Sequence, residues 1–172
     1  MFQRVSVKEL KKKSLYKILF GDVSFAPPEA FVYQIGKIIE SKNFDITKQT
    51  FDKINGFTFS DEANILRYVS MGDTVYDVAI PDDALVFSYT TPEINKPCFI
   101  TNKIIIGRPR KLTDKVCIEL YKTSDLPLES YYQILPHLVH CNLKETAQLI
   151  IKEKVKENTY DCVSEITKFF NK

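Results

Sequence analysis

The sequence predicts an α+β protein, in which a small, mostly antiparallel β domain with one inserted helix precedes a C-terminal helical segment of about three helices. Before residue 122, apolar side chains alternate with polar ones in several short runs, which is the period of a half-buried strand. After residue 123, apolar side chains recur with the period of a helix. Strands grouped before helices are typical of α+β folds. We therefore predict a mixed β domain over residues 1–122 and a helical tail over residues 124–172 that packs on it.

The centre of the predicted sheet is a strand, a sharp turn and a second strand. Apolar and polar side chains alternate over residues 76–80. Pro81 ends this strand because proline has no N–H to donate to a neighbouring strand. Asp82 and Asp83 favour a turn, and a second apolar run begins at Leu85. We interpret this hairpin-like unit as the middle of the sheet.

The remaining elements of the first part are short. Ser6 and Glu9 have the spacing of a capping box, which predicts a helical turn within residues 6–13. Ser60 can cap a helix over about residues 61–70, and Gly72 follows its end. Further strands are predicted at residues 15–20, 31–39 (bent at Gly36), 56–59, within 99–107, and at 115–122. We expect loops at residues 26–29, 40–55 and 90–97, and a basic turn at residues 108–114.

Three helices are predicted after residue 123. The first begins near Pro127, which the first turn of a helix tolerates, and Pro136 bends or restarts it. The second begins with Asn142 as its N-cap and Glu145 three residues later. The last carries an apolar face over residues 162–170.

Composition limits the class of protein. The chain has 172 residues, enough for one domain with a modest appendage, and 44% of them are hydrophobic. A net charge of +2 argues against the whole molecule being a polyanion binder. The four cysteines form no close pair, so we expect reduced thiols in an intracellular protein. No apolar stretch approaches the roughly 20 residues of a membrane span, so we expect a soluble protein with no membrane partner.

One motif, at His137, His140 and Cys141, brings together side chains that bind zinc. Two imidazoles three residues apart can share a helix face, but a zinc site needs three or four ligands, and the local spacing offers no fourth. A cysteine nucleophile would need a histidine beside it, whereas His140 and Cys141, as neighbours on a helix, point apart. Packing of buried thiols is the favoured interpretation. We assign no catalytic residue, no metal ligand and no cofactor.

A candidate basic patch brackets the predicted turn near residue 109. Its members are Lys103, Arg108, Arg110, Lys111 and Lys115. Such a cluster could contact phosphates, above all if it joined the lysines of residues 8–13 in one stripe. Charged side chains at strand ends also keep sheet edges soluble, and we favour that interpretation. Nucleic-acid binding is the third functional hypothesis.

Two local patterns carry a resemblance to a known family. Residues 56–60, 75–84 and 102–107 read GFTFS, VYDVAIPDDA and NKIIIG. This order looks like the N-terminal domain that precedes the repeats in ankyrin-repeat proteins of mimivirus-like giant DNA viruses, and it covers roughly residues 56–111. Residues 135–139 (LPHLV) and 142–151 (NLKETAQLII) are similar to one ankyrin repeat. They depart from it because the usual leucine between Pro136 and His137 and the threonine-proline opening are missing.

A second resemblance concerns an enzyme family. A strand with Lys17, then a strand and helix from Ser60, and a late glutamate, Glu119, look like the core of ADP-ribosyltransferases. In that family an arginine or histidine stands where this chain has Lys17. The resemblance implies an active or inactive transferase, whose pocket would need these three side chains to converge.

The favoured function is a non-enzymatic, intracellular protein-interaction module of viral origin that binds a host or viral protein in the host cytoplasm or the virion. The resemblance to viral proteins and the lack of a specific catalytic motif favour it. We expect the helical tail to supply the contact surface. An ADP-ribosyltransferase-like enzyme is the alternative, and the oligomeric state stays open.

Overall fold

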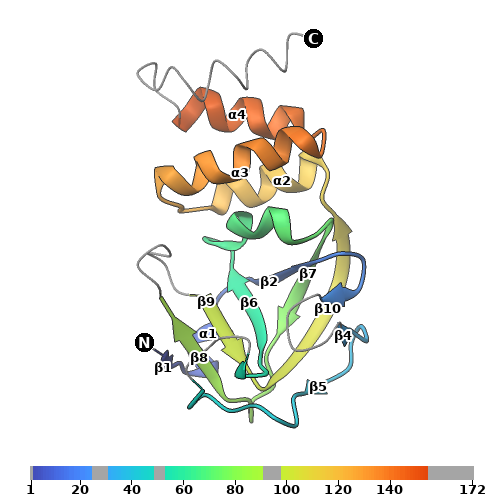
Figure 1. The fold of residues 1–172 in the computed structure, drawn as a ribbon, viewed down its shortest axis with the longest axis vertical. Helices are drawn as coiled ribbons and strands as arrows, with labels where there is room; N and C mark the ends of the chain where they lie inside the picture. The colour runs from blue at the N-terminus through green and yellow to red at the C-terminus, as the bar shows by residue number, and fades with distance from the viewer. Residues whose placement is uncertain (1, 25–30, 49–52, 91–97, 155–172) are drawn as a thin grey trace.

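The computed structural model describes residues 2–24, 31–48, 53–90 and 98–154 of the chain (Figure 1). Its main element is an eight-stranded antiparallel sheet, with the strand order β1-β8-β9-β6-β2-β7-β10-β5. A separate two-stranded sheet pairs β3 with β4. The strands are β1 (Phe2–Arg4), β2 (Leu15–Leu19), β3 (Val23–Ser24), β4 (Phe31–Val32), β5 (Ile39–Glu40), β6 (Phe57–Asp61), β7 (Thr74–Ala79), β8 (Val86–Tyr89), β9 (Cys98–Thr101) and β10 (Lys103–Lys111).

Four helices gather beyond one end of the sheet (Figure 1). They are the 3₁₀ helix η2 (Ile65–Met71), α2 (Asp114–Thr123), α3 (Leu128–His140) and α4 (Lys144–Lys154). The short helix α1 (Val7–Leu10) lies beside the strands, and its Leu10 is part of the sheet core. In Figure 1, η2 is drawn in green and lies between the sheet and the stack of α2, α3 and α4. The predicted α+β class is therefore confirmed.

Two hydrophobic cores meet at β2, because successive side chains of a strand point to opposite faces. Ile18 belongs to the helix-side core, which η2, α2, α3 and α4 form together with the sheet. Leu15 and Leu19 belong to the sheet core, which also contains Tyr76, the register partner of Lys17 on β7. One strand thus fixes the helical layer and the sheet interior relative to each other.

The predicted hairpin at the centre of the sheet is wrong in its pairing. Both strands exist, but β7 pairs with β2 and β10, whereas β8 pairs with β1 and β9. The turn after Pro81 therefore connects strands in different parts of the sheet. Local alternation identifies a strand, but its partners come from distant parts of the chain.

The strand predicted at residues 115–122 is wrong, because this segment is the helix α2. The side chain of Thr113 caps it by accepting a hydrogen bond from the backbone N–H of Val116. Cys117, Leu120 and Tyr121 are buried at helical spacing against the other helices. The helical part of the chain therefore begins at Asp114, before the predicted boundary at residue 124.

The helix predicted at residues 61–70 is shorter and of another type. Ser60 and Asp61 belong to β6, and η2 begins only at Ile65, after Asn64. Gly72 follows η2 as predicted. Its backbone is extended, with φ 172°, and not left-handed, so glycine is needed here for a different reason. A Cβ at this position would overlap the carbonyl oxygen of Leu19, so only glycine allows η2 to approach β2 this closely.

The bounds of several other predicted elements also differ from those in the structure. The predicted strand within residues 99–107 is the two strands β9 and β10, and the predicted basic turn up to Lys111 is the end of β10. Gly36 lies in a turn with φ 73°, between the short strands β4 and β5. Asn142 has φ 60° and precedes α4 instead of capping it.

Other predicted elements are confirmed. They are the strands at residues 15–20 and 56–59, the first helical turn and the first two C-terminal helices. The loop at residues 26–29 and the last helix lie outside the described residues.

Candidate functional site

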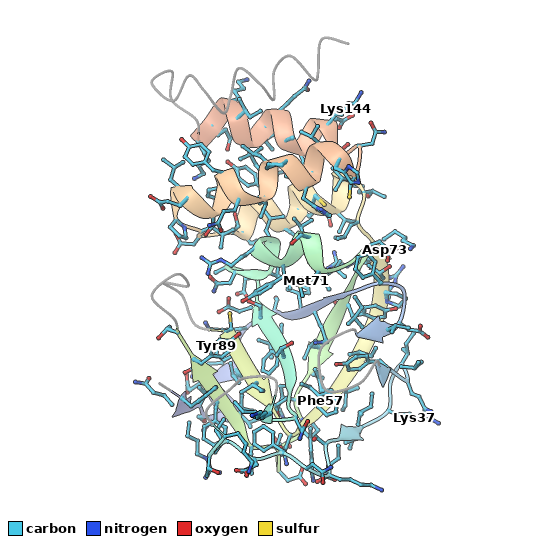
Figure 2. All side chains as sticks on the ribbon, in the orientation of Figure 1. Lys37, Phe57, Met71, Asp73, Tyr89 and Lys144 are labelled. Atoms are coloured by element: carbon cyan, nitrogen blue, oxygen red, sulfur yellow. The ribbon has the colours of Figure 1, made fainter. Side chains whose placement is uncertain are left out.

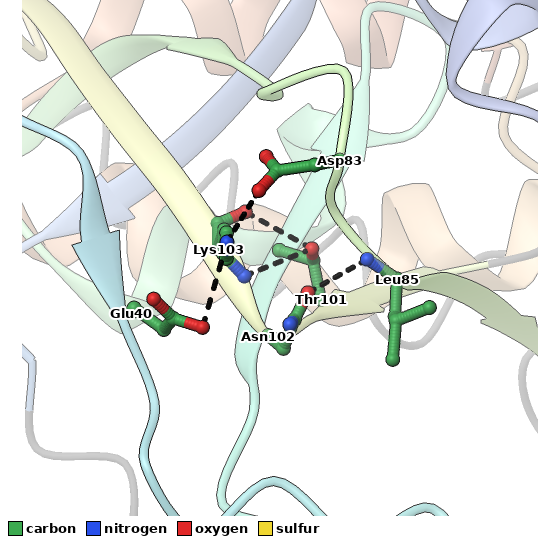
Figure 3. A network of polar contacts seen from close by, with 6 residues as sticks. All are labelled: Glu40, Asp83, Leu85, Thr101, Asn102 and Lys103. Atoms are coloured by element: carbon green, nitrogen blue, oxygen red, sulfur yellow. Dashed lines mark hydrogen bonds and ion pairs between the residues drawn. The ribbon is translucent and has the colours of Figure 1, made fainter.

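Acidic side chains neutralise much of the predicted basic patch. The ammonium group of Lys103 is ion-paired with Asp83 and lies 3.5 Å from Glu40 (Figure 3). The Asp83 carboxylate raises the pKa of Lys103. Beside this pair, the backbone N–H of Leu85 donates to Oδ1 of Asn102 at 2.7 Å. This network holds the turn after β7 against the β9–β10 corner, which is a structural role.

Two other patch members, Arg110 and Lys111, also meet carboxylates. Arg110 lies 3.6 Å from Asp77 and 3.4 Å from Glu119, and its guanidinium group covers the ring of Tyr16 at 5.6 Å. Lys111 is ion-paired with Asp73 at 2.7 Å. Arg108 and Lys115 are exposed. In the N-terminal basic run, Lys11, Lys12 and Lys13 likewise pair with Asp82, Glu9 and Asp61. These pairs reduce the positive potential that a phosphate backbone would meet.

The three side chains of the transferase-like hypothesis do not come together. Ser60 lies opposite Tyr16 in the β2–β6 register, so it shares the helix-side face of β2 with Tyr16. Lys17 points to the other face, into the sheet core. Glu119 lies on α2 and not on a late strand, and it is exposed and paired with Arg110. This geometry provides no shared pocket for the three groups.

Lys17 is buried, with 6% of its surface exposed. Its ammonium group donates to the carbonyl oxygen of Thr58 at 2.7 Å and lies 3.1 Å from the hydroxyl oxygen of Thr58. It also lies 5.5 Å from the ring centre of Tyr33, in a cation–π arrangement. Burial lowers the pKa of Lys17 to about 7. Its place between Tyr16 and Ile18 gave no sign of this environment, since a lysine in an alternating strand is typical of a solvent-facing position.

The structure pairs His137 with Cys141, a combination that the sequence interpretation missed. Nε2 of His137 lies 3.3 Å from Sγ of Cys141 at the C-terminal end of α3. Residues four apart on a helix lie on one face, and this spacing was the available signal. Among the described residues, no group of three or more histidine, cysteine, aspartate or glutamate side chains could hold a metal ion. His137, His140 and Cys141 therefore do not form the metal cluster that their spacing suggested.

A second thiol, Cys98, lies between two phenols where β9 meets η2. The hydroxyl group of Tyr68 contacts Sγ of Cys98, and Tyr89 is the register partner of Cys98 on β8 and also bonds to it. Burial raises the pKa of Cys98, although both phenols and the charge of Arg67 act in the opposite direction. Burial also raises the pKa of both tyrosines, so both phenols keep their hydrogens. This arrangement holds Cys98 as a neutral thiol.

The segment that runs from the end of β6 into η2 contains buried polar atoms without a protein partner. They are Oγ of Ser60, Oε2 of Glu62, Oδ1 of Asn64 and Nε of Arg67. Other atoms of the same segment are well bonded. Asn64 donates to Asp61 at 2.7 Å, and Arg67 donates to Ser130 of α3 at 2.8 Å. Buried polar atoms of this kind are commonly satisfied by ordered water.

Exposed apolar side chains concentrate in one short loop. Val32, Ile35 and Ile38 are 58%, 54% and 61% exposed, and we call residues 32–38 the apolar loop. The loop is fixed on the molecule, because the backbone N–H of Gly36 donates to the carbonyl oxygen of Ile106 at 2.8 Å and Tyr33 is buried. The neighbouring Lys37, labelled in Figure 2, extends away from the sheet. Single exposed apolar residues are ordinary, but such a group on an anchored loop is typical of a contact surface.

Comparisons do not identify a relative: no protein-family model, curated protein or solved structure matches the chain. Within the described residues, no helix is both long and apolar enough to cross a membrane. The functional argument therefore depends on the chain's own geometry.

Proposed function

We propose that this protein is a non-enzymatic interaction module that binds another protein through the apolar loop. The observation that carries this proposal is the exposure of Val32, Ile35 and Ile38 within seven residues of chain. Complete burial of an aliphatic side chain is worth about 1.5–3 kcal/mol, so a partner that covers all three would gain a useful part of its binding free energy there. This surface replaces the helical tail as the proposed contact region.

The loop is prepared for binding because its backbone is held at several points. Tyr33 packs edge-on against Phe57 with ring centres 5.9 Å apart, and its N–H donates to the carbonyl oxygen of Asp22 at 3.0 Å. At the other end, Ile39 pairs with Ile104 of β10. A surface that is already ordered loses less conformational entropy when it binds. The viral origin of the chain, its relation to ankyrin-repeat proteins and the identity of the partner remain predictions.

Site-specific photo-crosslinking tests the proposal. A benzophenone amino acid replaces Ile35 in the full chain, and Gln133, an exposed position on α3, serves as the control site. We expect the probe at position 35 to form a discrete crosslinked species with a partner protein. The probe at position 133 should form no such species. The double change Val32→Ser and Ile38→Ser should abolish it without lowering the melting temperature. Equal crosslinking at both positions, or crosslinking that survives the double change, would contradict the proposal.

A further inference from the structure

The thiol–imidazole pair lies at the end of α3, where the helix backbone holds its two residues. The backbone N–H of Cys141 donates to the carbonyl oxygen of His137 at 2.9 Å, which fixes the two residues relative to each other. Cys141 is exposed, whereas Cys98 and Cys117 are buried. An incoming small molecule can therefore reach the Cys141 sulfur directly.

The imidazole of His137 faces the Cys141 sulfur through Nε2. When the ring carries its hydrogen on Nδ1, Nε2 is an acceptor and can take the thiol hydrogen. Burial is the main cause that lowers the pKa of His137, although the backbone of Val69 on η2 acts in the opposite direction. The lowered pKa favours the neutral ring that a proton acceptor requires.

We propose that Cys141 is a nucleophilic thiol activated by His137, and that hydroperoxides oxidise it to a sulfenic acid. The arrangement has the two parts on which activation depends: the thiol and a base within hydrogen-bonding reach, 3.3 Å away.

The atoms and electrons of the step balance. Nε2 of His137 takes the thiol proton, and the Cys141 sulfur attacks one oxygen of the peroxide. An S–O bond forms and the O–O bond breaks. The sulfur loses two electrons, and the leaving oxygen gains them. The proton on His137 passes to this oxygen, so the products are a cysteine sulfenic acid and water, or an alcohol when the oxidant is an organic hydroperoxide.

Accessibility alone would also make Cys141 react faster than the buried thiols, so the test must separate exposure from activation. Burial raises the pKa of Cys117 to about 12, which makes it a slow internal reference. His140 provides the matched control for His137. It lies on the same helix end, directly beside Cys141 in the sequence, but the thiol bonds to His137.

The experiment treats the full chain with hydrogen peroxide in the presence of dimedone, which traps sulfenic acids, and measures the trapping rate at each cysteine by peptide mass spectrometry. We expect Cys141 to react at least about tenfold faster than Cys98 or Cys117. His137→Gln should slow trapping at Cys141 about tenfold, and His140→Gln should change it by less than about twofold.

Two outcomes would overturn the proposal. One is a trapping rate at Cys98 or Cys117 that equals the rate at Cys141 in the unsubstituted chain. The other is an equal rate at Cys141 in the two histidine variants, with circular dichroism showing that both are folded. The first comparison needs no substitution, so it can overturn the proposal even if His137→Gln does not fold. The second comparison is the one that separates activation by His137 from exposure of the thiol.

Discussion

The ammonium group of Lys17 on β2 donates to the carbonyl oxygen of Thr58 on β6 at 2.7 Å, inside the core of the sheet. Burial of a charge is unfavourable unless its surroundings compensate for the lost hydration, and here burial lowers the pKa of Lys17 to about 7. Since the unfolded chain keeps the ordinary value near 10.5, the unfolded state binds more protons than the folded state between these two pH values.

The first prediction follows from this difference. Stability should rise with pH from about 7 to about 10.5, and the full penalty should be present below pH 7. Lys17→Met should therefore raise the free energy of unfolding at pH 6, on the order of 2 kcal/mol, and flatten the pH dependence above pH 7. Urea unfolding at pH 6, 8 and 10 measures both effects. Lys122→Met, at an exposed position on α2, is the control and should change neither.

The second prediction concerns Gly72, where η2 meets β2. A methyl group there would overlap backbone atoms of Leu19, which cannot move aside as the end of a side chain can. Gly72→Ala should lower the free energy of unfolding by about 2–3 kcal/mol, measured by urea denaturation. At Gly107 the nearest atom to an added Cβ would be 3.4 Å away, so Gly107→Ala should have an effect of less than about 1 kcal/mol. Similar losses from both changes would refute the close-approach explanation.

The fold class could be predicted because it depends on local periodicity. β2 and β6 were recognised from alternation over residues 15–20 and 56–59, and α3 from its apolar spacing. Pairing could not be predicted in the same way. The partners of β7 are β2 and β10, and no short pattern encodes a contact with a strand more than 50 residues earlier, as at Tyr16 and Asp77.

The segment of α2 shows how one sequence supports two periods. Val116, Ile118 and Leu120 alternate as in a strand, while Cys117, Leu120 and Tyr121 form a helical face. Burial against α4 and η2 selects the helix, and a single sequence does not contain that information. Thr113, followed by Asp114, was the available local signal of a helix start.

The sites were less predictable than the fold. The pair of His137 and Cys141 was visible as a four-residue spacing, but the sequence interpretation compared the thiol with His140. The burial of Lys17 and the contact between Tyr68 and Cys98 depend on strands and helices that meet only in the folded chain. Exposure of the apolar loop is likewise a property of the whole surface, which apolar side chains in the sequence do not reveal.

The third prediction is that Asp73 makes the stability of the fold depend on pH in the acid range. Its carboxylate accepts hydrogen bonds from the N–H of Gly21 at 3.0 Å and from Lys111 at 2.7 Å, and these lower its pKa to about 2. A lowered pKa stabilises the fold above the ordinary value of 3.8, and this contribution is lost as the pH falls toward 2. Asp73→Asn should make the loss of stability between pH 4 and 2 less steep, as followed by thermal unfolding. The side chain is half exposed, so solvent screening keeps the effect modest.

A control for this prediction is Asp82→Asn. Asp82 is an exposed carboxylate that is ion-paired with Lys11. Asp82→Asn should change the loss of stability between pH 4 and 2 less than Asp73→Asn does. If stability falls as steeply with pH in the Asp73→Asn variant as in the unsubstituted chain, the hydrogen bonds of Asp73 do not persist in solution.

The last prediction concerns the joint between α2 and α4. Oδ1 of Asp114 accepts hydrogen bonds from the backbone N–H of Thr146 at 2.7 Å and from its hydroxyl group at 2.6 Å. Thr146 is fully buried, so Asp114→Ala would leave its backbone N–H without an acceptor, while its hydroxyl group would keep the longer bond to the carbonyl oxygen of residue 114 at 3.3 Å. We expect the substitution to lower the free energy of unfolding by about 1–3 kcal/mol in urea. Glu145→Ala, at the exposed neighbouring position, should cost less than about 0.5 kcal/mol. Among the described elements, α4 packs mainly on α2 and α3. In the Asp114 variant, hydrogen exchange should therefore become faster at the amides of α4 before it does at those of β2. Exchange that accelerates equally in both elements would show instead that the helical stack and the sheet unfold as one unit.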